Sequence, residues 1–149
     1  ELMDVLDNTR GRPKVLQSGT FSGNHLTLAA GLANLRALTP ELYERLDSLR
    51  ERLDTGLRDI FGRAQVPCQV QSVGSIVSFD FTDQPVRDYR SAASADKALF
   101  ERVRLELLLR GYYMFGGMGL CLSAPMSAEH VDGLLEALEA ALSDGADQA

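Results

Sequence analysis

The segment that most constrains the fold is a run of leucines spaced for one face of a helix. Between residues 42 and 60, a leucine or isoleucine recurs at steps of 4, 3, 4, 4 and 3, and charged residues fill most of the intervening positions. This spacing predicts an α-helix with one apolar stripe, which is stable in water only when that stripe is buried. Thr39, Pro40 and Glu41 form a helix start signal, and Gly62 is predicted to end the helix. The chain must therefore fold around a core that covers this stripe.

The rest of the chain predicts shorter elements that pack with this helix. A helix is expected after a cap at Ser22 or Asn24, with Leu28, Leu32, Leu35 and Leu38 as its stripe. Two further helices are expected, one at residues 95–110, capped by Ser94, and one from residue 127 onward. Strands are expected at 66–73 and 75–81, and a hairpin is expected from strands 112–115 and 120–123 around a turn at 116–119. Loops are expected at 1–18 and 86–93, and a frayed tail at 143–149. The predicted fold class is α+β, a small, mostly antiparallel sheet with helices covering one face.

Composition excludes several classes of function. The chain has 149 residues, enough for one core, and its net charge of -6 opposes binding to nucleic acid or to an anionic membrane surface. No stretch is apolar for long enough to span a bilayer. Cys68 and Cys121 lie among apolar neighbours, so both are expected to be buried thiols in a reduced, cytoplasmic protein. The chain also begins at Glu1 without a methionine, and we expect it to be a fragment of a longer protein.

Most familiar catalytic patterns are missing from the sequence. His25 and His130 lie in different predicted elements, and no Cys/His cluster has the spacing of a zinc site. Nucleophile-elbow, Walker and dinucleotide-binding glycine motifs do not occur. The glycines of residues 116–119 fit a hairpin turn, and His130 fits a surface position. The sequence therefore predicts no metal site and no catalytic residue within the chain.

The loop at residues 18–24, Ser-Gly-Thr-Phe-Ser-Gly-Asn, is the one candidate binding motif. Small hydroxyl residues and glycines directly before a helix expose backbone N–H groups and hydroxyls near the positive end of the helix dipole. Such a loop suits an oxyanion or a phosphate. The same residues also fit an elaborate helix cap without a ligand, and spacing alone leaves both readings open.

The run GTFSGN followed by LTLAAGLANLRAL resembles the class III pyridoxal-phosphate aminotransferases of fold type I, in the glutamate-1-semialdehyde aminomutase-like branch. The later pieces GSIVSFDF, RGYY and S-x-E-H-V-D follow in the family's order and extend the resemblance over nearly the whole chain. The resemblance implies a pyridoxal 5'-phosphate cofactor and a homodimer in which Thr20, supported by the backbone of Gly19, contacts the cofactor phosphate of the neighbouring subunit. It also implies that residues 1–25 end the large cofactor-binding domain and that 26–149 form the small C-terminal domain.

The resemblance also defines what this chain departs from. The family's Schiff-base lysine lies well before the threonine motif, and neither Lys14 nor Lys97 stands at a matching position, so the catalytic lysine is expected upstream of this chain. The motif's proline is His25 here. The stretch at 115–118 replaces a glutamine-phenylalanine-glutamate stretch, which favours another transaminase of the same branch over one specific for glutamate-1-semialdehyde.

The sequence thus predicts the C-terminal part of an enzyme that moves an amino group between an amino donor and a carbonyl compound, with a small amino or keto substrate. Two alternatives stay open. The chain fits a non-catalytic α+β dimerisation or interaction module whose 18–24 loop is a plain cap, or a degenerate paralogue that keeps the fold without the lysine. Whether this chain is an enzyme by itself is left open by its residues.

Overall fold

The computed structural model describes residues 2–9, 11–17, 19–114 and 119–146 and divides the chain into two units, 1–39 and 40–149. The first unit contains a short 3-10 helix, Leu2–Leu6, where a loop was predicted, and helix α1, His25–Ala37. The predicted domain boundary after residue 25 falls inside this unit, directly at the start of α1, and it stays a prediction.

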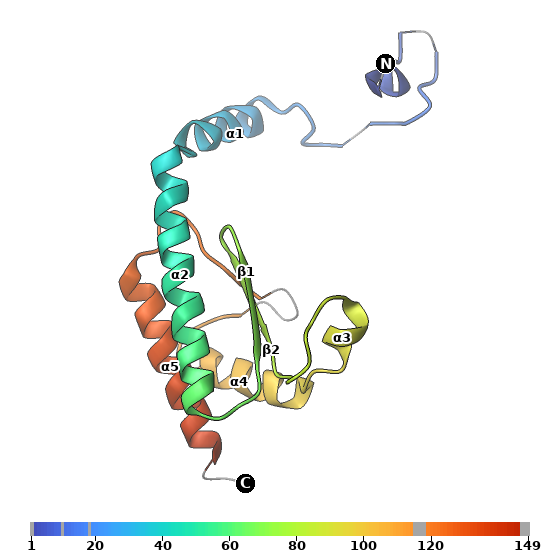
Figure 1. Cartoon of the computed structure of the whole chain (residues 1–149). Helices are drawn as coiled ribbons and strands as arrows, with labels where there is room; N and C mark the ends of the chain where they lie inside the picture. The colour runs from blue at the N-terminus through green and yellow to red at the C-terminus, as the bar shows by residue number, and fades with distance from the viewer. Residues whose placement is uncertain (1, 10, 18, 115–118, 147–149) are drawn as a thin grey trace. The chain divides into compact units, whose positions relative to one another are not determined.

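The second unit is the predicted α+β domain (Figure 1). Its sheet has the order β1-β2-β3, and both strand pairs are antiparallel. In chain order its elements are α2 (Pro40–Arg63), β1 (Gln69–Val73), β2 (Ile76–Asp80), α3 (Tyr89–Ala93), α4 (Lys97–Leu109), β3 (Leu120–Cys121) and α5 (Ala128–Ala146). The predicted fold class is confirmed, with helices on one face of a small antiparallel sheet.

The core lies between the sheet and helices α2, α4 and α5. Alternation along β2 points Val77 and Phe79 toward the helices, while Ser78 and Asp80 face the opposite side of the sheet. The predicted stripe of α2 supplies much of the remaining core, and Leu53 and Leu57 at its centre are fully buried. The long helix is thus stabilised by tertiary burial, as its sequence spacing required.

Helices α2 and α5 approach each other closely and run side by side in Figure 1. A Cβ atom added to Gly56 of α2 would lie 2.8 Å from Cδ2 of Leu135 on α5, so glycine lets the two helices approach. Near this crossing, Arg52 donates from Nε and Nη2 to the two carboxylate oxygens of Asp132, at 2.5 and 2.8 Å. This paired hydrogen bond links the two helices at their exposed edge.

A polar cluster, the Asp54–Arg58 clasp, joins α2 to β1. Arg58 donates from Nε to Oδ2 of Asp54 at 2.7 Å and from Nη2 to the carbonyl oxygen of Val70 at 2.6 Å. The Ser72 hydroxyl donates to Oδ1 of Asp54 at 2.9 Å. The Arg58 hydrogen bond lowers the pKa of Asp54 below its ordinary value, against a smaller opposing effect of burial.

This clasp predicts an acid-dependent loss of stability. Because the pKa of Asp54 is lower in the folded than in the unfolded state, its contribution is complete above the unfolded value of about 3.9 and is lost as the pH falls through the folded value. We expect Asp54→Asn to flatten the fall of the unfolding free energy below about pH 4, measured by urea unfolding across a pH series. Asp83→Asn, at an exposed loop position, is the control; equal slopes for wild type and Asp54→Asn would contradict the prediction.

The predicted hairpin of 112–115 and 120–123 is wrong in its pairing. Leu120 and Cys121 form β3 against β2, opposite Val77 and Ile76. Residues 112–114 form no strand, and the side chain of Met114 enters the core. Residues 115–118 lie outside the described part of the chain. The reason is that β1 covers only one edge of β2, so the other edge offers its backbone groups to the 120–121 segment.

The start of α4 also differs from the prediction. Residues 86–93 were expected to be a loop, but Asp88 and Ser91 form a reciprocal capping box that starts the short helix α3. Ser94 ends this helix, whereas α4 is capped by Asp96, whose Oδ1 accepts from the N–H of Leu99 at 2.9 Å. Two caps within a few residues split what the sequence suggested was one helix start.

Two predicted helix ends are too early. Helix α2 continues through Gly62 to Arg63, and the left-handed position is taken instead by Gln65, with φ of 55°. Helix α5 continues through most of the predicted tail to Ala146, and residues 147–149 lie outside the described chain. Both differences are local, because a helix end is set by its last hydrogen bonds rather than by a single residue type.

Candidate functional site

The loop before α1 folds as two consecutive tight turns. The N–H of Ser22 donates to the carbonyl oxygen of Gly19 at 3.0 Å, and the N–H of Asn24 donates to that of Phe21 at 3.2 Å. Gly23 takes a left-handed backbone with φ of 73°. A Cβ atom at Gly19 would lie 2.7 Å from the Ser22 hydroxyl oxygen, so a larger residue there would displace the Ser22 side chain. Ser18 lies outside the described residues.

Asn24 is the cap of α1. It accepts from the first backbone N–H groups of the helix, which the sequence pattern had suggested as donors to an anion. Its Oδ1 accepts from the N–H of Leu26 at 2.9 Å and from that of Thr27 at 3.3 Å. One of the two caps predicted, Ser22 or Asn24, is thereby identified. The helix start itself therefore has fewer donors free for a ligand than the sequence pattern suggested.

The donors that stay available belong to Thr20 and its neighbour. In the described part of the chain, Thr20 is exposed and makes no hydrogen bond through its hydroxyl or its backbone N–H. Phe21 is also exposed, and only its carbonyl oxygen is engaged. The loop thus presents one hydroxyl and adjacent backbone donors on a turn that a glycine shapes, which suits the oxygens of an anionic group.

The apolar side chains of α1 are exposed on the helix that follows this loop. The leucine stripe is helical as predicted, yet no residue of α1 is buried, and Leu28, Leu32 and Leu35 are 59%, 50% and 66% exposed. A stripe of leucines stabilises a helix only when other parts of the protein cover it.

The remaining predicted site residues are dispersed. Lys14 is exposed in the loop before Thr20, and Lys97 begins α4 in the second unit. His25 is the first residue of α1. His130 is exposed in α5, where its Nδ1 accepts from the N–H of Ser127 at 3.1 Å and so caps the helix, in agreement with the predicted surface position. Within each unit, no hydrogen bond or ion pair between described residues joins one of these side chains to another.

The two cysteines differ from each other. Cys68 is half-buried, and burial, followed by the charge of Asp80, raises the pKa of its thiol to about 12. Cys121 on β3 is exposed, so the prediction that both thiols are buried is wrong for this one. It lies on the side of the sheet opposite α2, α4 and α5, because it pairs with the outward-facing Ile76. Both are free thiols.

Two classes of site find no support in the described residues. Within residues 2–9, 11–17, 19–114 and 119–146, no group of three or more His, Cys, Asp or Glu side chains is arranged to hold a metal ion. No helix of these segments combines the length and the apolar character that crossing a membrane requires.

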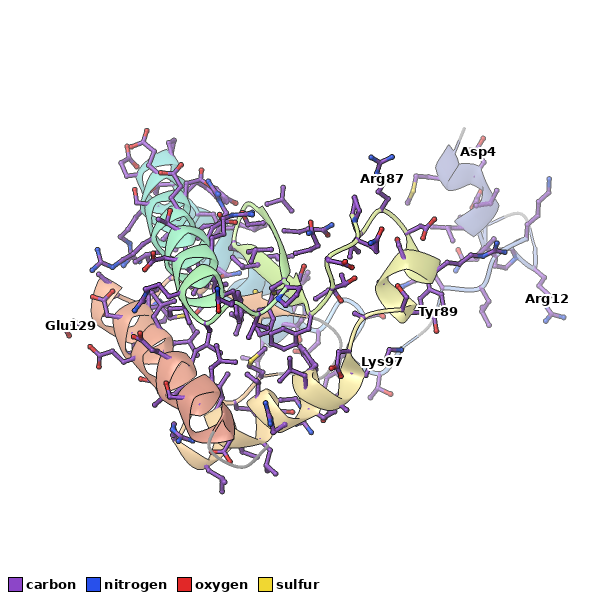
Figure 2. The ribbon with its side chains drawn as sticks, turned by 60° about the horizontal axis from the view of Figure 1, so that its bottom comes forward. Asp4, Arg12, Arg87, Tyr89, Lys97 and Glu129 are labelled. Atoms are coloured by element: carbon purple, nitrogen blue, oxygen red, sulfur yellow. The ribbon has the colours of Figure 1, made fainter. Side chains whose placement is uncertain are left out.

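A cavity on the outer side of the sheet was not anticipated from the sequence. It has a volume of about 630 Å³ and lies between β2, the segment carrying α3, and the start of α4. Its lining includes Asp80 from β2 and Lys97 from α4, with Phe100 and Met114 as apolar walls. Figure 2 shows Lys97 at the start of α4 and Arg87 on the loop before α3, its side chain directed away from the helix. Alternation along β2 showed which residues face outward, but the sequence did not show that α3 folds over them.

Comparisons with known proteins agree with the family resemblance. No family model matches the chain. It is 37% identical, over 145 residues, to the glutamate-1-semialdehyde 2,1-aminomutase of Anaeromyxobacter sp. (strain Fw109-5), covering 96% of this chain and 34% of that relative.

Two solved structures match at the level of the fold. The crystal structure of an omega-transaminase from Sphaerobacter thermophilus has 35% identity and a TM-score of 0.86, covering 96% of this chain and 33% of that one. A transaminase with PLP bound has 31% identity and a TM-score of 0.78, covering 95% and 32%. The chain spans about a third of the length of the relatives it matches.

Proposed function

We propose that this chain provides a cofactor-phosphate contact and the small domain of a pyridoxal-phosphate enzyme. It belongs with the C-terminal portions of the class III pyridoxal-phosphate aminotransferases of fold type I, in the glutamate-1-semialdehyde aminomutase-like branch. The complete protein would move an amino group between an amino donor and a carbonyl compound. The single observation that carries the local part of this proposal is the Thr20 hydroxyl on the turn before α1, which makes no hydrogen bond to a described residue.

The loop fits the phosphate of pyridoxal 5'-phosphate chemically. A phosphate dianion binds best to several hydrogen-bond donors on a fixed backbone, and charge-assisted hydrogen bonds are stronger than neutral ones. Thr20 would donate its hydroxyl to the phosphate, and the turn that contains Thr20 is closed by the hydrogen bond from the Ser22 N–H to the Gly19 carbonyl oxygen. Asn24 engages the first N–H groups of α1, so the helix contributes mainly by fixing the loop.

The reacting chemistry is assigned to residues outside this chain. When bound, pyridoxal phosphate supplies the carbonyl group that accepts the amino group and the ring that withdraws electrons. We do not assign the lysine that holds it to Lys14 or Lys97, because neither stands at the position that the family resemblance implies. We therefore place the catalytic lysine upstream of this chain.

The same proposal includes the assembly. We assign residues 1–25 to the end of the large domain and 26–149 to the small domain, and we expect a homodimer in which Thr20 contacts the cofactor of the neighbouring subunit. The exposed apolar stripe of α1 supports burial against further protein in the complete enzyme. The free thiols Cys68 and Cys121 support a reducing, cytoplasmic compartment.

The test of the loop is Thr20→Val in the full-length protein. Valine keeps the branched shape and removes the hydroxyl, so the dissociation constant of pyridoxal phosphate is expected to rise roughly tenfold or more, as for loss of a hydrogen bond to a charged group. The constant is measured by spectroscopic titration of the apo-protein, with unchanged circular dichroism as the check on folding. Thr27→Val, the same change on α1, is the matched control; equal constants for wild type and Thr20→Val would refute the phosphate role.

A non-catalytic interaction module is the second candidate, favoured by the unburied leucine stripe of α1. Borohydride reduction of the full-length protein with pyridoxal phosphate, followed by peptide mapping, separates the two. The enzyme proposal expects the label on one lysine that is neither Lys14 nor Lys97. No label, or a label on Lys14, would contradict it.

A further inference from the structure

The cavity on the outer side of the sheet contains charges that the fold does not use. Four acidic residues line it, and three of them are engaged within the described chain. Asp88 caps α3, Asp96 caps α4, and Glu101 pairs with Arg104 at 2.7 Å. Asp80 is the fourth, and its carboxylate takes part in no hydrogen bond or ion pair with a described residue.

Asp80 stands in a partly buried position. It is half-buried on the outward-facing side of β2, and burial raises the pKa of its carboxyl group above the ordinary value. A carboxylate that loses water without gaining a partner destabilises the folded state, and a cation placed beside it removes that cost. The position therefore favours a positively charged group within the cavity.

The cavity also offers an unpaired cation at a second wall. Lys97 at the start of α4 lines it and makes no ion pair with any described carboxylate, Asp80 included. Lys97 and Asp80 therefore line the same cavity more than the ion-pair limit apart, and neither side chain has a hydrogen-bond or ion-pair partner among the described residues. Phe100 and Met114 supply apolar wall in the same cavity.

We propose that this cavity binds a small, flexible zwitterion with an ammonium group at one end and a carboxylate at the other. The ammonium group is placed at Asp80 and the carboxylate at Lys97. A short aliphatic linker lies against Phe100 and Met114. The volume of about 630 Å³ is in the range of small-molecule sites, and two polar anchors on apolar walls are typical of them. This inference does not rest on the proposed function, because it uses no cofactor.

The test is calorimetric titration of the full-length protein without pyridoxal phosphate, using 4-aminobutyrate, n-butylamine and butyrate as probes. We expect 4-aminobutyrate to bind more tightly than either singly charged probe. Asp80→Asn is expected to weaken 4-aminobutyrate and n-butylamine by roughly tenfold or more, and Lys97→Met to weaken 4-aminobutyrate and butyrate similarly. Butyrate should be insensitive to Asp80→Asn, and n-butylamine to Lys97→Met.

Asp83→Asn is the matched control, because it removes one negative charge from the neighbouring loop outside the cavity lining. It should leave all three affinities unchanged. Failure of 4-aminobutyrate to saturate wild type, or binding that survives Asp80→Asn unaltered, would overturn the inference. An equal loss in Asp83→Asn would also overturn it, by reducing the effect to net charge. Since the titration contains no cofactor, these outcomes are separate from those of Thr20→Val.

Discussion

Leu53→Ala is expected to lower the free energy of unfolding by about 3 kcal/mol, within the range for buried leucines. Leu53 is 0% exposed at the centre of the α2 stripe and packs within the main core cluster. Alanine would remove the transfer free energy of the lost carbons and leave a cavity that the surrounding helices fill only in part. Urea unfolding monitored by circular dichroism gives the difference.

Leu109→Ala is the matched control, because it makes the same chemical change at a residue of α4 that is 73% exposed. Its effect should stay within about 0.5 kcal/mol. Similar losses for the two variants would show that α2 does not form the centre of the core, and the fold described above would be wrong at its main element.

Phe79→Ala should have the largest effect in the sheet, about 4 kcal/mol. Its ring centroid lies 5.3 Å from that of Phe61, 5.5 Å from that of Phe81 and 5.7 Å from that of Phe100. These contacts join β2 to α2 and α4, so truncation removes a large buried area together with the tilted and edge-on ring contacts. The same unfolding measurement tests it.

Two comparison variants separate area from ring geometry. Phe79→Leu keeps most of the volume and should cost less than Phe79→Ala. Val73→Ala, on the exposed outer side of β1, should change stability little. A loss for Phe79→Ala no larger than that for Val73→Ala would mean that the cluster does not bind the sheet to its helices.

Much of the secondary structure followed from spacing in the sequence. The leucines of α2 recur with the period of a helix, and Val77, Phe79 and Phe81 alternate with the period of a strand. Burial on one face of the element explains both patterns. Start signals were less decisive where several cap residues lie close together. Asp88 and Asp96 both cap helices, and the prediction assigned the single start to Ser94.

Strand pairing was not available from the sequence. Residues 120–121 pair with the free edge of the central strand β2 and not with the segment nearest to them in the chain, which the sequence had suggested as their partner. This choice also exposes Cys121, whose apolar neighbours in the sequence had suggested burial. Sequence neighbours do not report which side of a sheet a residue faces until the register is known.

The candidate site divides in the same way. Glycine and hydroxyl spacing singled out Gly19 and Thr20, but only the structure showed that Asn24 accepts from the first helix donors and that Thr20 has no hydrogen-bond partner among the described residues. The role of Thr20 toward a cofactor stays a prediction for the longer protein. The cavity with Asp80 and Lys97 had no sequence signal, because its walls come from β2 and α4, joined by a loop of unpredictable course.

By itself, then, the sequence determined the elements with a single dominant periodicity, the α+β class and the family resemblance. Local hydrogen bonding and side-chain spacing act over a few residues, so they are written directly into the chain. Only the tertiary structure decided the partner of β3, the exposure of Cys121 and the meeting of Asp80 with Lys97 around one cavity. These depend on contacts between segments far apart in sequence, where many pairings are sterically allowed and the burial of the whole core selects one.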